Sequence, residues 1–389
     1  MFRARARRDT DVAHGFAWNR FALVLTFLTG CGDSRPDPDP PPRAVVPAYR
    51  GEHPPAPEEY LAHRTVDSIA IDGSLQETSW AEAKWTRPFV DIEGPRRPTP
   101  AWETRVKMVW DDRALYVAAK LEEPHLWGTI TERDAVIFHD NDFEIFLDPD
   151  GDSHRYYELE INALGTVWDL FLDKPYRDGG TALNEWDIAG LETAVALDGT
   201  INDPADRDRG WTVEVLIPWS ALPDRPGGGS GDPPTDGEQW RVNFSRVQWQ
   251  LDVADTGYRK RTDSSGNPRA EDNWVWSAQD AINMHMPEMW GIVQFSDTPA
   301  AQGSLAVSQI EGAAAAWLLR RLYYDQRAYL LERGSYGSMA EIGWDPGEVR
   351  LVLDDSATAF RALVTDGAMT WSIDNDGRLL HRPASEERQ

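Results

Sequence analysis

Between residues 65 and 297 the sequence consists of short segments in which apolar and polar residues alternate, and turn-forming residues end each segment. The segments lie at 105–110, 114–121, 143–147, 156–162, 166–172, 211–217, 240–249 and 291–295. A side-chain period of two is that of a β-strand, and no long amphipathic helical pattern interrupts the series. We therefore predict an all-β domain over residues 65–297, folded as an antiparallel β-sandwich or jelly roll.

The alternation divides the neighbouring segments 142–148 and 156–162 into two faces. The apolar positions predict a core-facing side, and they are Phe143, Ile145, Leu147, Tyr157, Leu159 and Ile161. The other side mixes carboxylates, amides and aromatic rings, and we expect Arg246 and Gln248 to share it. For any single residue there, a solvated outer sheet face is the simpler interpretation. Taken together, hydrogen-bonding groups beside aromatic planes suit a polyol ligand.

The first 31 residues have the pattern of a bacterial lipoprotein signal. Basic residues up to Arg20 precede the apolar run 21–28, which is too short to span a bilayer. Leu28-Thr29-Gly30-Cys31 resembles a lipobox, and lipidation would give a role to Cys31, the only cysteine of the chain. Because Gly32 stands where Asp would retain a lipoprotein in the inner membrane, we predict a signal peptide and lipobox at 1–31 and an outer-membrane lipoprotein of the cell envelope.

The next residues and the overall charge limit the function further. Residues 32–64 are rich in proline and charge, which predicts a disordered, extended tether. The chain has 39 Lys and Arg against 65 Asp and Glu, a net charge of −26. Such a field repels polyanions, so we expect no nucleic-acid partner.

Residues 305–380 have a different pattern. Apolar residues recur every three or four positions over 308–333, which predicts a helix that Gly334 ends. Short strand patterns follow at 349–353, 359–364 and 369–373. We predict a small α+β accessory domain over 305–380, which could bind an envelope protein partner, and a disordered tail over 381–389.

The order of motifs in the β-domain resembles the family 9 carbohydrate-binding modules. The matching segments are Ile71-Asp-Gly73 with Trp80, 106–112 with 115–117, 142–149, 156–162 with Gly165-Thr166, 210–219, 242–246, 274–277 and 284–291 with Phe295. The resemblance implies a β-sandwich that binds sugars, an association with secreted glycan-processing enzymes and hence with carbohydrate catabolism, and calcium in some members. Modules of the family can hold a sugar between two tryptophans, and Phe138 and the Met284-His285 region stand at those positions here.

The polar face and the resemblance together nominate site residues. The candidates for carbohydrate binding are Phe138, Trp127, Trp276, His285, Glu160 and Arg246. A structural role is the alternative for each tryptophan. The candidates for calcium, through the resemblance, are Asp140, Asp142 and Asp148. For Asp148-Pro-Asp-Gly-Asp152, a plain hairpin turn is the simpler interpretation.

Three functions stay open from the sequence. The leading prediction is an exported, lipid-anchored protein that holds a poly- or oligosaccharide on one face of the sandwich and supports carbohydrate catabolism. The second is a glycoside hydrolase that uses two strand glutamates, Glu144 and Glu160, with a structural cross-strand pair as the competing interpretation. The third is a non-catalytic envelope assembly lipoprotein.

Overall fold

The structure is a computed structural model that describes residues 56–223, 231–302, 306–310, 312–345, 347 and 349–385. The predicted signal peptide, Cys31 and most of the predicted tether lie outside the described residues. Within the described ranges, no helix combines the length and the apolar character needed to cross a membrane.

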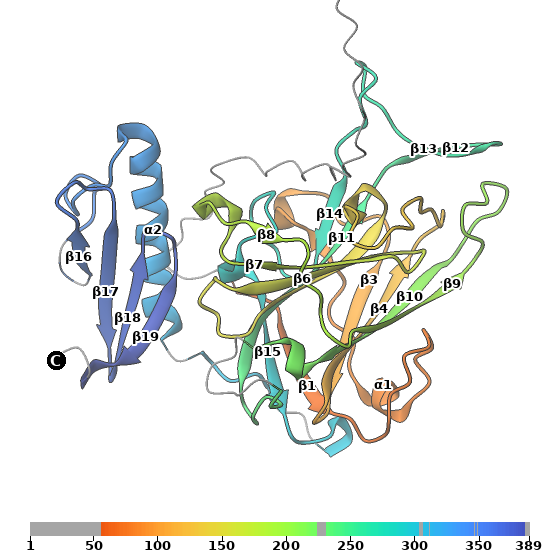
Figure 1. Ribbon diagram of the computed structural model, residues 1–389, viewed down its shortest axis with the longest axis horizontal. Coiled ribbons are helices and arrows are strands. Elements are labelled where there is room, and N and C mark those ends of the chain that lie inside the picture. Colours follow the sequence, from red (N-terminus) through yellow and green to blue (C-terminus); the bar gives the residue numbers. More distant parts are fainter. Residues whose placement is uncertain are drawn as a thin grey trace, which may run out of the picture. The chain divides into compact units, whose positions relative to one another are not determined.

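The predicted β-domain is a curled β-sandwich (Figure 1). Its first strands are β1 (Glu59–Arg64), β2 (Val90–Asp91), β3 (Thr104–Trp110), β4 (Ala114–Glu122), β5 (Asp142–Asp148), β6 (Tyr156–Asn162), β7 (Val167–Leu172) and β8 (Ala182–Leu183). The later ones are β9 (Glu192–Asp198), β10 (Gly210–Pro218), β11 (Gln239–Gln248), β12 (Leu251–Ala254), β13 (Gly257–Lys260), β14 (Asp272–Val275) and β15 (Gly291–Ser296). The main sheet runs in the order β8-β7-β6-β5-β11-β15-β1-β3-β4-β10-β9, with β14 paired to β11 and β2, whereas β12 and β13 form a separate ribbon. A short helix, α1 (Thr78–Glu82), precedes β2.

The sheet is mixed rather than purely antiparallel because of β1. This strand pairs in parallel with β15 and with β3, whereas the other strand pairs are antiparallel. It lies within the range predicted as a tether, so that prediction is wrong for 59–64. Tyr60 and Ala62 are buried, and the segment exchanges backbone hydrogen bonds with a strand more than 200 residues away. Such a long-range pairing leaves little trace in a six-residue local pattern.

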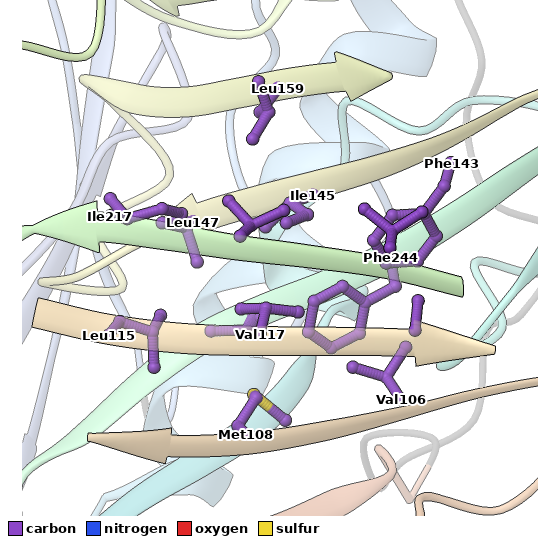
Figure 2. Close-up of a cluster of buried hydrophobic side chains, with 14 of the residues drawn as sticks. Val106, Met108, Leu115, Val117, Phe143, Ile145, Leu147, Leu159, Ile217 and Phe244 are labelled. Carbon is purple, nitrogen blue, oxygen red and sulfur yellow. The ribbon is translucent and has the colours of Figure 1, made fainter. Parts of the chain in front are cut away.

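The sandwich encloses one large apolar core, part of which Figure 2 shows. The predicted core-facing side of β5 and β6 is confirmed: Phe143, Ile145, Leu147 and Leu159 belong to this core. Phe143 stacks on Phe244 of β11 at 5.9 Å between ring centroids. The period of two therefore placed the apolar side chains correctly, and it leaves the opposite side of the same strands to the polar residues.

The C-terminal α+β unit is also present. Its helix α2 (Ala313–Arg333) packs on β17 and β18 of an antiparallel sheet made of β16 (Arg350–Leu353), β17 (Phe360–Asp366), β18 (Met369–Asp374) and β19 (Leu379–Pro383). The helix begins five residues later than predicted, after Gly312 in a left-handed conformation (φ 72°), and Gly334 ends it as expected. Because β19 extends to Pro383, the predicted disordered tail begins too early at 381.

A buried polar network joins α2 to the sandwich. Arg177 forms an ion pair with Glu288 at 2.8 Å, and Tyr324 of α2 donates a hydrogen bond to the same carboxylate. Tyr323 of α2 donates to Asp178. The C-terminal domain, which we predicted as a possible binding site for an envelope partner, therefore uses part of α2 for contacts within the chain itself.

Candidate functional site

Residues on the polar side of β5 and β6 form rows that run across the sheet. The strand register places Ser245 of β11, Glu144 of β5, Glu160 of β6 and Trp168 of β7 directly beside one another. The next row contains Asn243, Phe146, Glu158 and Leu170. Directly paired residues point to the same side of a sheet, so three glutamates share one small area.

This side of the sheet is buried, which corrects the interpretation of a solvated outer face. Glu144 is 5 % exposed and Glu160 2 %. Ile137 packs over the sheet with Phe146, Trp168 and Trp290 in a second apolar cluster. The loops before β5 and before β15 provide this cover, and such long-range packing is invisible in the alternation of a single strand.

Burial changes the acidity of these glutamates, which have no ion pair with any described residue of the chain. Burial raises the pKa of Glu144 to about 7. Burial and the neighbouring charge of Glu144 hold the pKa values of Glu158 and Glu160 well above their ordinary range. Near neutral pH this group of carboxyls therefore retains protons, and it can both donate hydrogen bonds and accept them.

Two of the predicted aromatic residues lie beside this group. The backbone N–H of Phe138 donates to Glu160 Oε2 at 2.9 Å, and its carbonyl accepts from Trp249 Nε1 at 2.8 Å. Trp127 packs with Trp249 and Val247, and half-buried Phe138 adjoins this cluster. The structure thus brings together Phe138, Trp127 and Glu160, which are far apart in the sequence.

Sequence reasoning missed Trp249 and Lys260 at this place. The Lys260 ammonium lies 3.2 Å from the centroid of the Trp249 ring and 5.9 Å from that of Trp127. Burial lowers the pKa of Lys260 to about 8. Lys260 ends β13 and pairs with Leu251 of β12, so the ribbon places its ammonium beside Trp249, whereas no strand was predicted over residues 251–260. Trp249 is the last residue of the predicted strand segment 240–249, and nothing in that pattern marked its ring as part of a site.

Arg246 does not share the face of Glu144, so that prediction is wrong. In β11 it follows Phe244 by two positions and therefore points to the side of the core. Its guanidinium donates to Glu123 Oε2 at 3.0 Å, to Thr104 Oγ1 at 3.0 Å and to Gln248 Oε1 at 2.9 Å, and it is 1 % exposed. Arg246 of β11 thus links this strand to β3 and to the residue after β4 across the sandwich.

A groove lies beside the hydrogen bonds of Arg246 to Glu123 and Gln248. It has a volume of about 840 Å³, and its lining includes Trp102, Glu123, Gln248, Trp249 and Trp274. The Trp249 ring therefore belongs both to this groove and to the aromatic cluster that contains Trp127. Aromatic planes and polar groups along one groove are the lining expected where a chain of hydroxylated rings binds.

Two other nominated residues lie elsewhere. Trp276 is 1 % exposed in the main core, with its ring 5.7 Å from that of Phe244, so it is a core residue and not a ligand platform. His285 accompanies Tyr156, with its Nδ1 3.0 Å from the tyrosine hydroxyl, near the α2 network. Burial and the nearby Arg177 lower the pKa of His285 to about 3, so the imidazole is neutral.

The three calcium candidates lie in three different environments. Asp140 accepts hydrogen bonds from Thr129, from the Ile130 backbone and from Asn162. Asp148 accepts from backbone N–H groups in the turn between β5 and β6, where Gly151 has φ 66°, and its carboxylate forms a separate group of clustered oxygens with Asp150 and Asp152. Neither aspartate joins Asp142.

Asp142 instead forms a group with Glu144 and Glu160. Each of the three residues offers an oxygen within 4.8 Å of the others. Among the described residues, Asp142 Oδ2 has no hydrogen-bond partner although it is buried. Clustered carboxylate oxygens, one of them unpaired, fit a hard cation such as calcium.

The same group bears on the hydrolase alternative. A glycosidase needs its two carboxyl groups on either side of the bond that breaks. Glu144 and Glu160 instead emerge side by side from paired strand positions and lie under the residues that cover the sheet. Glu144 and Glu160 therefore do not flank an open space as the two carboxyl groups of a glycosidase do.

Comparison with known proteins places these features in a family. Residues 71–297 match the profile of the family described as "Carbohydrate family 9 binding domain-like". None of the curated proteins matches the chain.

Solved structures also resemble the chain. One is a family 9 carbohydrate-binding module from Caldicellulosiruptor kristjanssonii in complex with cellotriose (18 % identity, 64 % of this chain and 99 % of that one, TM-score 0.40). Another is a putative carbohydrate-binding protein from Bacteroides uniformis ATCC 8492 (17 % identity, 62 % of this chain and 100 % of that one, TM-score 0.43).

Proposed function

Because the chain belongs to the carbohydrate family 9 binding domain-like family, we propose that it binds a poly- or oligosaccharide beside the polar face of β5 and β6. The observation that carries the proposal is the row of Glu144 and Glu160 next to Phe138, Trp127 and Trp249. Carboxyl groups with raised pKa values can donate to some sugar hydroxyls and accept from others. The aromatic rings offer flat apolar surfaces for the sugar rings.

The groove lined by Trp102, Trp249 and Trp274 supports a ligand longer than one sugar. Lys260 covers one face of the Trp249 ring, so a sugar that stacks there must displace the ammonium. We propose that Phe138 and the groove make the first contacts, and that the β12–β13 ribbon adjusts around the bound chain.

The cellular location of the protein is part of the same proposal. We propose that the chain is exported, that Cys31 is lipidated, and that the protein holds glycan at the outer membrane for carbohydrate catabolism. The lipobox-like Leu28-Thr29-Gly30-Cys31 and the acidic, proline-rich segment after it support this location.

A glycan array with the full chain, followed by affinity electrophoresis on the polysaccharides that bind, tests the function. We expect at least one glycan to bind, and we expect Phe138→Ala and Glu160→Gln to weaken binding by roughly tenfold. The matched control is Glu59→Gln, an exposed glutamate on β1, which should bind as the unaltered chain does.

Two outcomes would overturn the proposal. A broad array without any binding would favour the envelope assembly alternative. Release of reducing ends from a bound glycan, abolished by Glu144→Gln or Glu160→Gln, would establish the hydrolase instead.

A further inference from the structure

A second cavity lies away from the candidate sugar site, between α2, the β18–β19 hairpin and the strands β11 and β15. Its volume is about 300 Å³. Much of its wall is apolar and aromatic, and includes Trp240, Ile292, Trp317, Met369 and Trp371. A volume of this size lies at the lower end of the range for small-molecule sites.

Two arginines line this cavity without a carboxylate partner. Arg320 of α2 is 1 % exposed and donates from Nη1 to the Gly377 carbonyl at 2.8 Å and from Nη2 to Ser153 Oγ at 2.9 Å. Arg241 of β11 donates to the Trp290 carbonyl at 2.9 Å. Within the part of the chain that the structure describes, neither guanidinium has a carboxylate at ion-pair distance, although Asp148 and Glu288 act on Arg241 from farther away and oppose the burial that lowers its pKa to about 10. A buried, unpaired charge is costly, so this pair of cations needs an explanation.

Unused hydrogen-bond donors accompany the arginines. Among the described residues, neither Arg320 Nε nor Trp371 Nε1 has a hydrogen-bond partner, and both atoms are buried. The Trp371 indole lies against Gly312, where an added Cβ would be 2.5 Å from Nε1. Both unsatisfied groups are donors, so the cavity calls for an acceptor.

The N-terminus of α2 also favours a hydrogen-bond acceptor with negative charge in the cavity. Its N-cap, Gly312, provides no side-chain cap, and the first turn contains no acidic residue. Ala313 and Ala316 of the first turns line the cavity. The Ala313 N–H donates to the Ile310 carbonyl at 3.3 Å, and the positive end of the 21-residue helix favours an anion at this place.

The acidic side chains at the cavity are engaged elsewhere. Glu288 is held by Arg177 at 2.8 Å and by the Tyr324 hydroxyl. Asp150 lies in the turn between β5 and β6, where its carboxylate accepts the backbone N–H of Asp152 at 3.2 Å. Neither carboxylate lies at ion-pair distance from Arg320, although Arg320 helps Arg177 to lower the pKa of Glu288.

We propose that this cavity binds a small organic acid, with its carboxylate at Arg320 and Trp371 beside the α2 N-terminus and its apolar body between Ile292 and Trp317. The ligand would supply the acceptor that two buried donors lack. It would also place a negative charge beside two cations inside a chain whose net charge is −26. This site is distinct in place and chemistry from the proposed sugar site.

Calorimetric titration of the full chain with 3-phenylpropionate and with the neutral 3-phenylpropionamide tests the proposal. The two probes have the same apolar body, so we expect the acid to bind roughly tenfold more tightly than the amide. Arg320→Gln should remove that preference. Arg333→Gln, an exposed arginine at the end of the same helix, is the matched control and should retain it.

Ala316→Leu keeps every charge and fills part of the cavity. Because it leaves Arg320 in place, it tests the site even if the Arg320→Gln chain fails to fold. We expect it to abolish binding of 3-phenylpropionate while the melting temperature stays equal or rises. Equal affinities for acid and amide, no binding of either probe at millimolar concentration, or unchanged binding in Ala316→Leu would each overturn the proposal.

Discussion

Glu144 on β5 and Glu160 on β6 are directly paired in the strand register, and both side chains emerge on the same buried face of the sheet. Like charges at directly opposite positions destabilise a sheet, and burial adds to that cost. A third glutamate, Glu158, lies in the neighbouring row. Groups whose pKa values are shifted in this way by burial and by each other concentrate at functional sites. The pair is therefore the centre of the candidate sugar site.

The first prediction concerns stability and pH. Burial raises the pKa of Glu144 to about 7 from an ordinary value of 4.5, so the folded state favours the protonated form. Between those two pH values the folded state binds more protons than the unfolded state, and the free energy of unfolding falls as the pH rises. We expect Glu144→Gln to be more stable than the unaltered chain at about pH 8, by up to ~3 kcal/mol, and to gain little at about pH 4.

Urea unfolding in the presence of EDTA, at both pH values, measures this difference. EDTA ensures that no divalent cation compensates the carboxylates. Glu59→Gln, the exposed control, should follow the unaltered chain at both pH values. An equal effect of Glu144→Gln at both pH values would contradict the raised pKa.

The second prediction concerns calcium. The oxygens of Asp142, Glu144 and Glu160 form a ligand set that competes with protons, because the same carboxylates bind both. Calcium at millimolar concentration should therefore raise the melting temperature, and by more at about pH 8 than at about pH 5. Asp142→Asn should lose the effect, whereas Glu59→Gln, the exposed control on β1, should keep it. A calcium effect that survives Asp142→Asn would place the ion elsewhere.

The third prediction distinguishes an aromatic residue of the core, Trp276, from an aromatic residue that contacts glycan, Phe138. Trp276 lies in the main core, so Trp276→Ala should lower the free energy of unfolding by about 3–5 kcal/mol. Phe138 is half-buried, and Phe138→Ala should cost less stability and more glycan affinity. Urea unfolding and affinity electrophoresis of the two variants check this opposite order. A Trp276 variant that folds with full stability and loses glycan binding would restore the role first assigned to Trp276.

The fourth prediction concerns the anchor. Cys31 is the one cysteine of the chain, so a labelled fatty acid can be incorporated there alone among cysteines. In a bacterial host, Cys31→Ala should abolish incorporation of labelled palmitate and move the protein from the membrane fraction to the supernatant. Gly32→Asp should leave labelling intact and retain the protein in the inner membrane. Palmitate labelling of the Cys31→Ala chain would contradict the lipobox.

The local sequence was sufficient for eight strands of the sandwich, β3 to β7, β10, β11 and β15, and for the core-facing side chains of β5 and β6. Phe143, Ile145 and Leu147 followed from a period of two, because alternation along a strand is a property of the backbone alone. The same rule implies that Glu144 and Glu160 leave their strands on the other side. The end of α2 at Gly334 was equally local, since a left-handed C-cap needs only the glycine itself.

Only the tertiary structure decided what covers that other side and what meets there. Lys260 reaches Trp249 and Trp127 from a separate ribbon, and β1 enters the sheet through a partner more than 200 residues away. Arg246 was misplaced because the register between β11 and β5, which no single strand contains, puts Ser245 beside Glu144. The sequence by itself determined which residues are polar and which strand face they occupy. Their burial, their raised pKa values and their partners arise from contacts between distant segments, which only the folded chain brings together.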